Sequence, residues 1–343
     1  MPGPLFSILI PAYKDIYFKE CVDSVLSQTY CNFELIIVND CSPYGISEIV
    51  KGYNDPRIKY FINEKNYGAY HLVDNWNNGL RYVSGDYVIC MGDDDKLMPN
   101  CLKDFAELIH QYPDLDIYHM RTLVIDEHSR VISIQEDRPT YESVYSMIWH
   151  YFIKHRIQYI GDWLFKTDSL KKNGGFVFTP YGWSADNLSA FATAMEKGVA
   201  NTHVFGFQYR LTGQTISTGD YTLEETKAWS IATKWYEDFL SKTPNNEMDL
   251  LYWKSIIKNF QSIMQHIIEM EIKSDLSQRP YHIFKWLKKN NDIGTSKKQI
   301  RSLLWGVLRK NGFWYNMKIT LLYLSTTRPL CYLFNKNSVN SPH

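Results

Sequence analysis

The sequence has little of what marks secreted, zinc-binding or membrane-spanning proteins. Its six cysteines are scattered over 343 residues without a CxxC pair, which argues against a disulfide framework or a zinc knuckle and fits reduced thiols in the cytoplasm. No window reaches the roughly 18 uncharged apolar residues that a transmembrane helix needs. The best candidate, 319–334, is interrupted at 326–329. Residues 1–4 carry no basic region ahead of the short apolar run 6–10, so we expect no signal peptide.

Acidic residues are almost absent from the C-terminal part of the chain. Residues 279–336 contain twelve Lys and Arg against one acid, Asp292, while the whole chain has a formal net charge of zero. The basic tail on an acidic body suggests an anionic surface as a partner, either membrane headgroups or nucleic acid. The 45% hydrophobic and 15% aromatic content otherwise describes a globular protein, and the length favours two domains or one large domain with an appendage.

The first 120 residues alternate short apolar runs with helical patterns, which predicts an α/β fold with a mostly parallel sheet. Runs 6–10, 35–38 and 87–91 are apolar on both faces, as in buried central strands, and residues 18–26 follow the spacing of a one-sided helix.

The second half of this domain is predicted to be mixed. We expect strands near 117–125, 130–135 and 158–165, a helix before the last of these, and a helix near 184–196 that ends before Gly198. Strand signals stop beyond residue 220, and a long amphipathic helix follows around 256–268. We therefore predict a catalytic-type domain over 1–218, with halves at about 5–115 and 116–218, and a helical extension over 219–343.

Glycine-rich phosphate loops are missing. The first strand is followed by Pro11, Ala12 and Tyr13 without GxGxxG, and GxxxxGK[ST] occurs nowhere. This argues against a dinucleotide-binding site or a P-loop. A phosphate group would then need a metal ion for neutralisation, which points to a sugar nucleotide held through its diphosphate.

Polar residues stand where ligands of open α/β sheets bind, just after the strands. Asp40 follows the second strand, and Asp93, Asp94 and Asp95 follow the strand at 87–91. Three adjacent carboxylates repel one another unless a cation such as Mg²⁺ or Mn²⁺ offsets their charge. The alternative is that the three acids only form a turn and a helix cap ahead of a proline. An aromatic ring such as Tyr13 beside a carboxylate such as Asp40 can stack on a base and accept its N–H.

Four segments together resemble the GT-A glycosyltransferases of family 2. They are FSILIPAY at 6–13, CVDSVLSQTY at 21–30, ELIIVNDCS at 34–42 and GDYVICMGDDD at 85–95, followed by Pro99. The resemblance is collinear over residues 5 to about 217 and does not extend to the helical tail. It implies a GT-A fold and a nucleotide-sugar transferase that inverts the anomeric carbon.

The resemblance also implies roles for single residues. Pro11, Ala12 and Tyr13 would contact the nucleotide, with Tyr13 stacked on the base, and Asp40 would bind that base through a hydrogen bond. Asp93 would touch the ribose and Asp94 the divalent ion, with Asp95 as a further metal candidate. Relatives more often carry an aspartate at the position of Gly92.

Two further positions follow from the resemblance. Asp186, at the start of the helix near 184–196, matches the place of the catalytic base, which would take the proton of the acceptor hydroxyl. The alternative for Asp186 is an acid that only favours the helix dipole. Many relatives have an arginine where this chain has Trp76, so Arg210 is a candidate to face the diphosphate.

We therefore expect a metal-dependent inverting glycosyltransferase that uses a nucleotide sugar, with a UDP-sugar favoured. A glycan or lipid-linked acceptor in bacterial surface polysaccharide synthesis is expected. The alternative is a binding or scaffold protein of the same fold without turnover. A retaining transferase and a nucleotidyltransferase are narrower rivals.

The tail adds an expectation about location. Its residues 297–310 form an amphipathic helix with charges on one side and an apolar stripe on the other, near Trp305, Phe313, Trp314 and Tyr315; the stripe comprises Ile300, Leu303, Leu304, Val307 and Leu308. This pattern is typical of a segment in the headgroup plane of a membrane. We expect peripheral contact with the inner face of the cell membrane and no binding of nucleic acid. The alternative is that the stripe packs on the catalytic domain.

Overall fold

The computed structural model describes residues 3–213, 222–290 and 295–310. Among these, residues 3–213 and 231–260 form one compact unit, and residues 222–230, 261–290 and 295–310 form a second. The boundary expected near residue 220 lies outside the described residues. None of the described helices is long and apolar enough to span a membrane.

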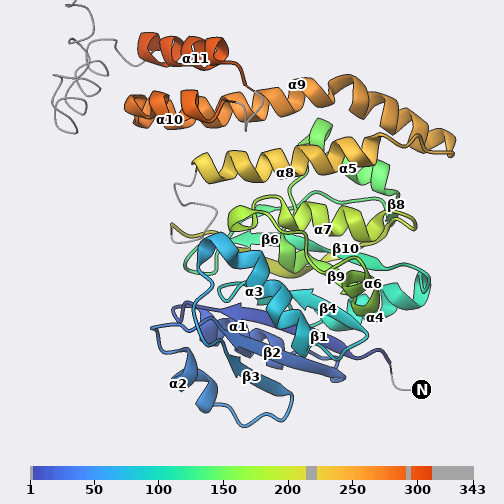
Figure 1. Cartoon of the computed structure of the whole chain (residues 1–343). Helices are drawn as coiled ribbons and strands as arrows, with labels where there is room; N and C mark the ends of the chain where they lie inside the picture. Colours follow the sequence, from blue (N-terminus) through green and yellow to red (C-terminus); the bar gives the residue numbers. More distant parts are fainter. Residues whose placement is uncertain (1–2, 214–221, 291–294, 311–343) are drawn as a thin grey trace, which may run out of the picture. The chain divides into compact units, whose positions relative to one another are not determined.

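The first half of the first unit is a parallel sheet with helices packed on it (Figure 1). Strands follow the order β3-β2-β1-β4, all parallel, so the parallel sheet predicted for the first 120 residues is confirmed. The strands are β1 (Phe6–Ala12), β2 (Phe33–Asn39), β3 (Ile58–Ile62) and β4 (Tyr87–Cys90), and the helices are α1 (Phe18–Leu26), α2 (Ile46–Lys51), α3 (Leu72–Gly79) and α4 (Cys101–Gln111). Strands β1, β2 and β4 are buried along their whole length or nearly so, because their side chains are apolar on both faces.

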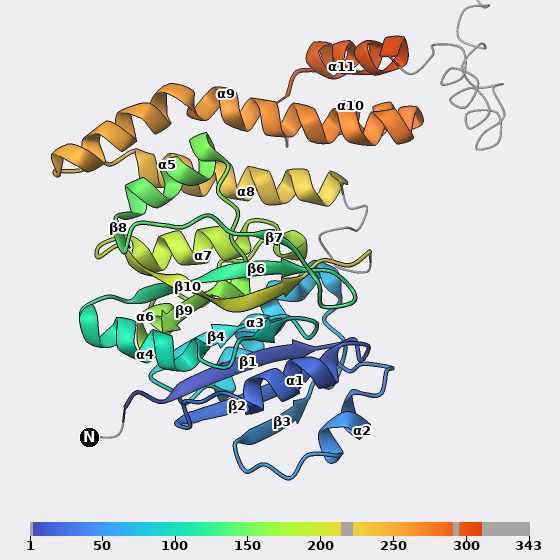
Figure 2. The same cartoon turned by 180° about the vertical axis from the view of Figure 1, so that it is seen from behind.

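The second half continues the same sheet but makes it mixed, as Figure 2 shows from behind. The path runs on as β4-β9-β6-β10-β5, and β9 lies antiparallel to both β4 and β6. The α/β class is confirmed. The elements are β5 (Lys96–Leu97), β6 (Ile117–Ile125), β7 (Val131–Ile134), β8 (Tyr141–Glu142), α5 (Val144–Lys154), β9 (Trp163–Lys166), α6 (Thr167–Lys172), α7 (Ala185–Ala194) and β10 (Val199–Arg210).

The strand expected near 158–165 starts later than the pattern indicated. Residues Ile160–Asp162 form a 3-10 turn, and β9 begins only at Trp163. The cause is the buried carboxylate of Asp162, which accepts a hydrogen bond from the Tyr159 backbone N–H at 3.1 Å and so closes the turn. Apolar side chains in the turn gave it the appearance of a strand.

The core of the first unit lies on one face of the parallel strands and under α1 and α4. It is a continuous cluster of fully buried apolar side chains that includes Phe6, Ile8, Phe18, Leu35 and Phe105. Burying each such side chain contributes roughly 1.5–3 kcal/mol. This packing fixes the carboxyl ends of β1, β2 and β4, where the polar residues of the site begin.

Four described helices follow β10: α8 (Thr222–Leu240), α9 (Glu247–Gln278), α10 (Ile283–Lys288) and α11 (Lys297–Lys310). The first part of α9 belongs to the first unit and is joined to α5. The Trp149 indole N–H donates to Ser255 Oγ at 2.9 Å, and the Ser143 hydroxyl donates to Asp249.

The second unit has its own small core. Ile272 and Leu276 of α9 pack with Ile283 and Trp286 of α10, and Asp275 accepts a hydrogen bond from the Trp286 indole at 2.7 Å. Ile300 and Val307 of α11 are buried in the same cluster, and Leu303 and Leu304 pack against it. The apolar stripe of 297–310 therefore serves packing within this unit. Phe313, Trp314 and Tyr315 lie outside the described residues.

Candidate functional site

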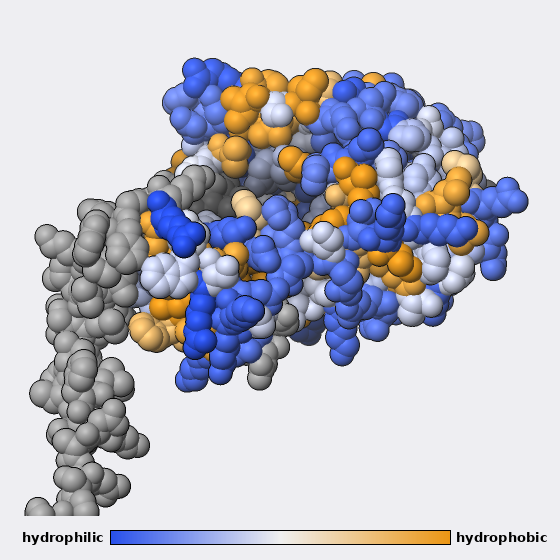
Figure 3. Space-filling model, turned by 90° about the horizontal axis from the view of Figure 1, so that it is seen from above, coloured by the Kyte–Doolittle hydropathy of each residue, from blue (hydrophilic) through white to orange (hydrophobic). Residues whose placement is uncertain are grey.

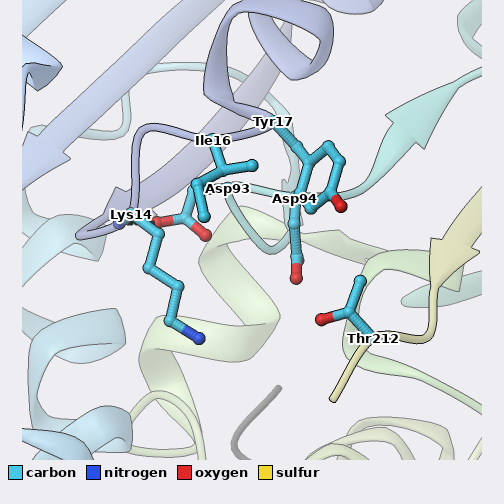
Figure 4. A pocket seen from close by; sticks show the side chains of 6 residues that line it. All are labelled: Lys14, Ile16, Tyr17, Asp93, Asp94 and Thr212. Carbon is cyan, nitrogen blue, oxygen red and sulfur yellow. Dashed lines mark hydrogen bonds between the residues drawn. The ribbon is translucent and has the colours of Figure 1, made fainter. Parts of the chain in front are cut away.

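A small pocket opens where β1 and β4 end side by side (Figure 4). The turn after β4 carries Asp93, whose Oδ2 accepts hydrogen bonds from the backbone N–H groups of Tyr13 at 2.6 Å and Lys14 at 2.7 Å. This contact confirms that the acids after the strand at 87–91 and the residues after the first strand meet at one edge of the sheet. The pocket is lined by Lys14, Ile16, Tyr17, Asp93, Asp94 and Thr212.

Lys14, Tyr17 and Thr212 line the pocket but were not predicted from the sequence. The Lys14 amine and the Asp94 carboxylate both project into the space between the β1 loop and Thr212, as Figure 4 shows. Lys14 directly follows Tyr13, so its position just after the first strand could have marked it as a site residue in the sequence. It puts a positive charge beside the acids, which suits an anionic ligand.

The acids of the turn carry charge that the protein offsets only in part. Burial, followed by the negative charge of Asp94, raises the pKa of Asp93 to about 7. Burial also raises the pKa of Asp94, while Lys14 and then Arg210 oppose the shift. Both shifts show that the ionised forms need further positive charge nearby.

Asp95 lies beneath the pocket rather than in it. It is 3% exposed, and its carboxylate accepts hydrogen bonds from the Arg210 backbone N–H at 2.9 Å and the Gly92 N–H at 3.2 Å. Burial raises its pKa well above the usual value, and the charge of Asp94 adds to the shift. These contacts give Asp95 the place of a structural acid within the turn.

Arg210 is buried under the same turn. Its Nε donates to the Asp94 carbonyl at 2.8 Å, an Nη donates to Glu20 at 3.1 Å, and its guanidinium lies 4.2 Å from the Tyr17 ring centre. The side chain is fully buried and does not line the pocket. Arg210 therefore supports the turn and the ring of Tyr17, which lines the pocket, from below. Lys14 is the basic side chain in the lining itself.

Gly92 leaves room for the acids that follow it in the turn. A Cβ atom at this position would come within 2.9 Å of both Asp94 Oδ1 and Asp95 Oδ2. The absence of a side chain here lets the two carboxylates approach the backbone of the turn.

Asp40 and Tyr13 lie on the neighbouring strand ends. The Asp40 backbone N–H donates to the Ala12 carbonyl at 2.9 Å, and its buried carboxylate accepts from Asn63 Nδ2 at 2.9 Å and the Tyr67 N–H at 3.0 Å. Burial raises the pKa of Asp40. The carboxylate thus anchors the 63–67 loop.

The Tyr13 ring is 38% exposed and packs edge-on against Tyr44 at 5.7 Å between ring centres. Ala12 is fully buried, which leaves its backbone for contacts, and Pro11 is partly buried.

The residues present fit a divalent ion shared with a ligand, and not a site made by protein alone. No group of three or more His, Cys, Asp or Glu residues within the described ranges is arranged to hold a metal. Asp94, with Asp93 beside it, offers hard oxygen atoms in the pocket. Mg²⁺ is commonly bound through one or two carboxylates plus phosphate oxygens of a substrate.

Asp186 opens α7 in its first turn and is partly exposed. Burial raises the pKa of the Asp186 carboxylate to about 7, and the negative charge of Asp162 adds to the rise. The hydrogen bond from the Asn187 backbone N–H opposes this rise. Asp186 does not line the pocket. Asp95 and Asp186 both act electrostatically on Tyr159, whose pKa is raised mainly by burial, so this tyrosine lies within range of both acids.

The first part of the chain is similar to known glycosyltransferase sequences. Residues 7–166 match the sequence model of glycosyl transferase family 2. An uncharacterized glycosyltransferase of Rickettsia typhi is 35% identical over 116 residues, which cover 34% of this chain and 35% of that protein. A putative colanic acid biosynthesis glycosyl transferase of Escherichia coli is 37% identical over 106 residues, or 30% of this chain and 37% of that protein. The matches thus span about a third of the length of these curated relatives.

Solved structures share the fold over most of the chain. S. aureus TarS 1–349 in complex with UDP-GlcNAc matches with a TM-score of 0.63 at 17% identity, over 94% of this chain and 92% of that chain. The mannosyltransferase PcManGT from Pyrobaculum calidifontis, in complex with GDP-Man and Mn²⁺, matches with a TM-score of 0.51 at 13% identity. The match covers 90% of this chain and 87% of that chain. At these identities the comparison establishes the GT-A-like fold alone.

Proposed function

Residues 7–166 match the sequence model of glycosyl transferase family 2, and on this premise we propose that the chain transfers a sugar from a nucleotide-diphosphate donor to a hydroxyl group of an acceptor. The observation that carries the proposal is the pocket in which Asp94 and Lys14 stand together at the ends of β1 and β4. Carboxylates and an amine side by side suit a diphosphate bound with a divalent cation.

The donor would lie along the strand ends. Tyr13 would stack on the base, Asp40 would accept its N–H, and the backbone at Pro11 and Ala12 would complete the base site. Asp93 would bind the ribose, and Lys14 would contact the diphosphate. We favour a UDP-sugar, because TarS, which shares the fold, has been solved with UDP-GlcNAc. GDP-sugars are the other class to test, since PcManGT was solved with GDP-Man.

In the reaction, Asp186 would take the proton of the acceptor hydroxyl while that oxygen attacks C1 of the sugar. The bond from C1 to the diphosphate oxygen breaks as the new bond forms on the opposite face, so the product has the inverted configuration. A raised pKa of about 7 suits a general base that works near neutral pH. Asp94, together with the diphosphate, would hold a divalent ion such as Mg²⁺ or Mn²⁺, which would supply positive charge to the leaving group.

The acceptor would be a glycan or a lipid-linked sugar at the cytoplasmic face of the membrane. The name of the Escherichia coli relative refers to colanic acid biosynthesis, which supports this acceptor class. In the second unit, Phe284 is 56% and Trp305 53% exposed, and Lys297, Lys298 and Arg301 are exposed on α11. Figure 3 shows hydrophobic groups set among hydrophilic ones on the face that it views. Exposed aromatic and basic side chains together favour contact with anionic headgroups.

The test is a screen of UDP-, GDP- and dTDP-sugars with the full chain, with and without Mn²⁺. A binding donor should raise the melting temperature, since a ligand stabilises the state that it binds. Release of the nucleotide diphosphate with lipid-linked acceptors should follow for the same donor, with inversion at C1. Binding without release for any acceptor would favour the inactive scaffold, and retention at C1 would overturn the single displacement.

A further inference from the structure

The segment that leads into α7 is held in an unusual backbone conformation. Tyr181 has φ 57° and Ser184 has φ 64°, both in the left-handed region that residues with a side chain seldom adopt. Helix α7 then begins at Ala185. Such conformations persist where the surroundings enforce them, and they cluster at functional sites. The backbone before Asp186 is thus held in place rather than relaxed.

One neighbour controls the orientation of the Asp186 carboxylate. Asn187 donates two hydrogen bonds to the same oxygen, Oδ1: one from its backbone N–H at 2.8 Å and one from Nδ2 at 3.0 Å. In the described part of the chain, no hydrogen bond from another residue reaches the second oxygen, Oδ2. One carboxylate oxygen is therefore fixed, and the other is left for a ligand.

The side-chain amide of Asn187 is itself held by a hydrogen bond from Gln158. Gln158 Nε2 donates to Asn187 Oδ1 at 2.5 Å, and both side chains are buried, at 6% and 7% exposure. Because Asn187 Oδ1 is the acceptor for Gln158, its Nδ2 must be the atom that faces Asp186. Gln158 thereby selects the amide orientation that donates to the carboxylate.

We propose that Asn187 and Gln158 are positioning residues that hold Asp186 Oδ1 and so present Oδ2 to the acceptor hydroxyl. The inference rests on the proposed function, in which Asp186 is the base. A base that is oriented by a third group is the arrangement that activates nucleophiles in other transferases and hydrolases. Asn187 and Gln158 belong to different segments, so the pair also ties the start of α7 to the turn before β9.

The surroundings of Asp186 make the effect measurable as a pH dependence. The negative charge of Asp162 raises the pKa of Asp186, and burial raises the pKa of Asp162 itself to about 7, so the two acids titrate in the same range. Tyr151, Tyr159 and Tyr236 lie within electrostatic range of Asp186 and are neutral at working pH, because burial raises their pKa values. The donors of Asn187 oppose the rise. Removing the Asn187 amide should therefore raise the pKa of the base and move the acidic limb of the rate profile to higher pH.

The experiment compares Asn187→Ala and Gln158→Leu with Thr193→Ala in the full chain. Thr193 lies further along α7, is buried, and donates to Ser189 without touching Asp186, so it controls for damage to the helix. Positioning predicts that kcat falls roughly ten-fold or more for Asn187→Ala, with donor KM nearly unchanged. The acidic limb of the profile should shift upward, and Gln158→Leu should shift it in the same direction by less.

Two outcomes separate this inference from the proposed function. If wild type transfers and Asp186→Asn does not, but Asn187→Ala and Gln158→Leu keep the rate and pH profile of Thr193→Ala, positioning is wrong and the base assignment stands. If Asp186→Asn transfers at the wild-type rate, the base assignment itself fails. Should Asn187→Ala not fold by circular dichroism, the pH profile of Gln158→Leu decides.

Discussion

Asp94 and Lys14 carry charges of opposite sign in the lining of the pocket, and each supports a separate expectation. Replacing Asp94 with Ala removes the carboxylate that would share a divalent ion with the diphosphate. We expect transfer to fall about 100-fold or more and the response to Mn²⁺ to disappear, with the fold intact. Donor hydrolysis measured over a series of Mn²⁺ concentrations checks this, with Glu107→Ala, an exposed acid on α4, as the control.

Lys14→Ala should instead weaken binding of the nucleotide diphosphate. A charge-assisted contact with phosphate contributes about 1.5–3 kcal/mol, so we expect about a ten-fold or greater loss of affinity for UDP or GDP. Isothermal titration with the free nucleotide measures it. The exposed Lys65, changed to Ala, is the matched control. Equal affinity for the two variants would remove Lys14 from the donor site.

For single residues, the sequence predicted that the acids after the strand at 87–91 form part of the site, but not which of them line the pocket. Asp93 and Asp94 reach the pocket as expected from their place after a buried strand. Asp95 and Arg210 do not, because Arg210 turns inward to satisfy the carbonyl of Asp94 and the backbone N–H of Arg210 reaches Asp95. No periodicity in the sequence reveals which of three adjacent acids faces inward.

Among the elements, the parallel strands share one buried acid. Glu34 on β2 accepts hydrogen bonds from Ser7 on β1 at 2.5 Å, from Lys59 on β3 at 2.5 Å, and from the backbone and hydroxyl of Ser84 ahead of β4. One side chain therefore connects four neighbouring strands. Although burial opposes it, the hydrogen bonds from Lys59, Ser7 and Ser84 lower the pKa of Glu34 from 4.5 to about 2.

This lowered pKa predicts a loss of stability in acid. A group with a depressed folded-state pKa stabilises the protein above its unfolded value of 4.5, and the contribution is lost as pH falls towards about 2. The shift corresponds to about 3 kcal/mol of the free energy of unfolding. Urea denaturation followed by circular dichroism at several pH values should show that Glu34→Gln lacks this acid-dependent part. Glu48→Gln, which removes an exposed acid of α2, should retain it.

Element types were predicted better than element ends. The buried strands β1, β2 and β4 and the helices α1 and α7 follow directly from apolar spacing. The start of β9 does not, because the Asp162 carboxylate closes a turn that apolar residues hide. The stripe on α11 was recognised correctly as amphipathic, but its partner was not, since a stripe of this kind suits a membrane and a helical core equally well.

For the molecule as a whole, the separation of charge along the chain is the feature that sequence and structure share. The described basic residues of α11 are exposed while its apolar side is packed, so headgroup binding would depend on charge more than on insertion. We expect the full chain to co-sediment with vesicles that contain phosphatidylglycerol and to dissociate at high ionic strength.

Changing Lys297, Lys298 and Arg301 together to Glu should weaken this binding by about 100-fold or more, at about 1 kcal/mol for each charge near the surface. The same change at three exposed lysines of the first unit, Lys65, Lys103 and Lys172, is the control. Equal sedimentation of the two triple variants, or none by wild type, would leave the second unit without a role at the membrane.

The turn at Gly92 also bears on how this site can change by mutation. Because a Cβ there would come within 2.9 Å of carboxylate oxygens of both Asp94 and Asp95, a side chain at position 92 would require one or both carboxylates to shift. A substitution at 92 and a change at 94, 95 or the supporting Arg210 should therefore not have additive effects. The consequences of any change at Gly92 would reach the pocket through the two acids that follow it.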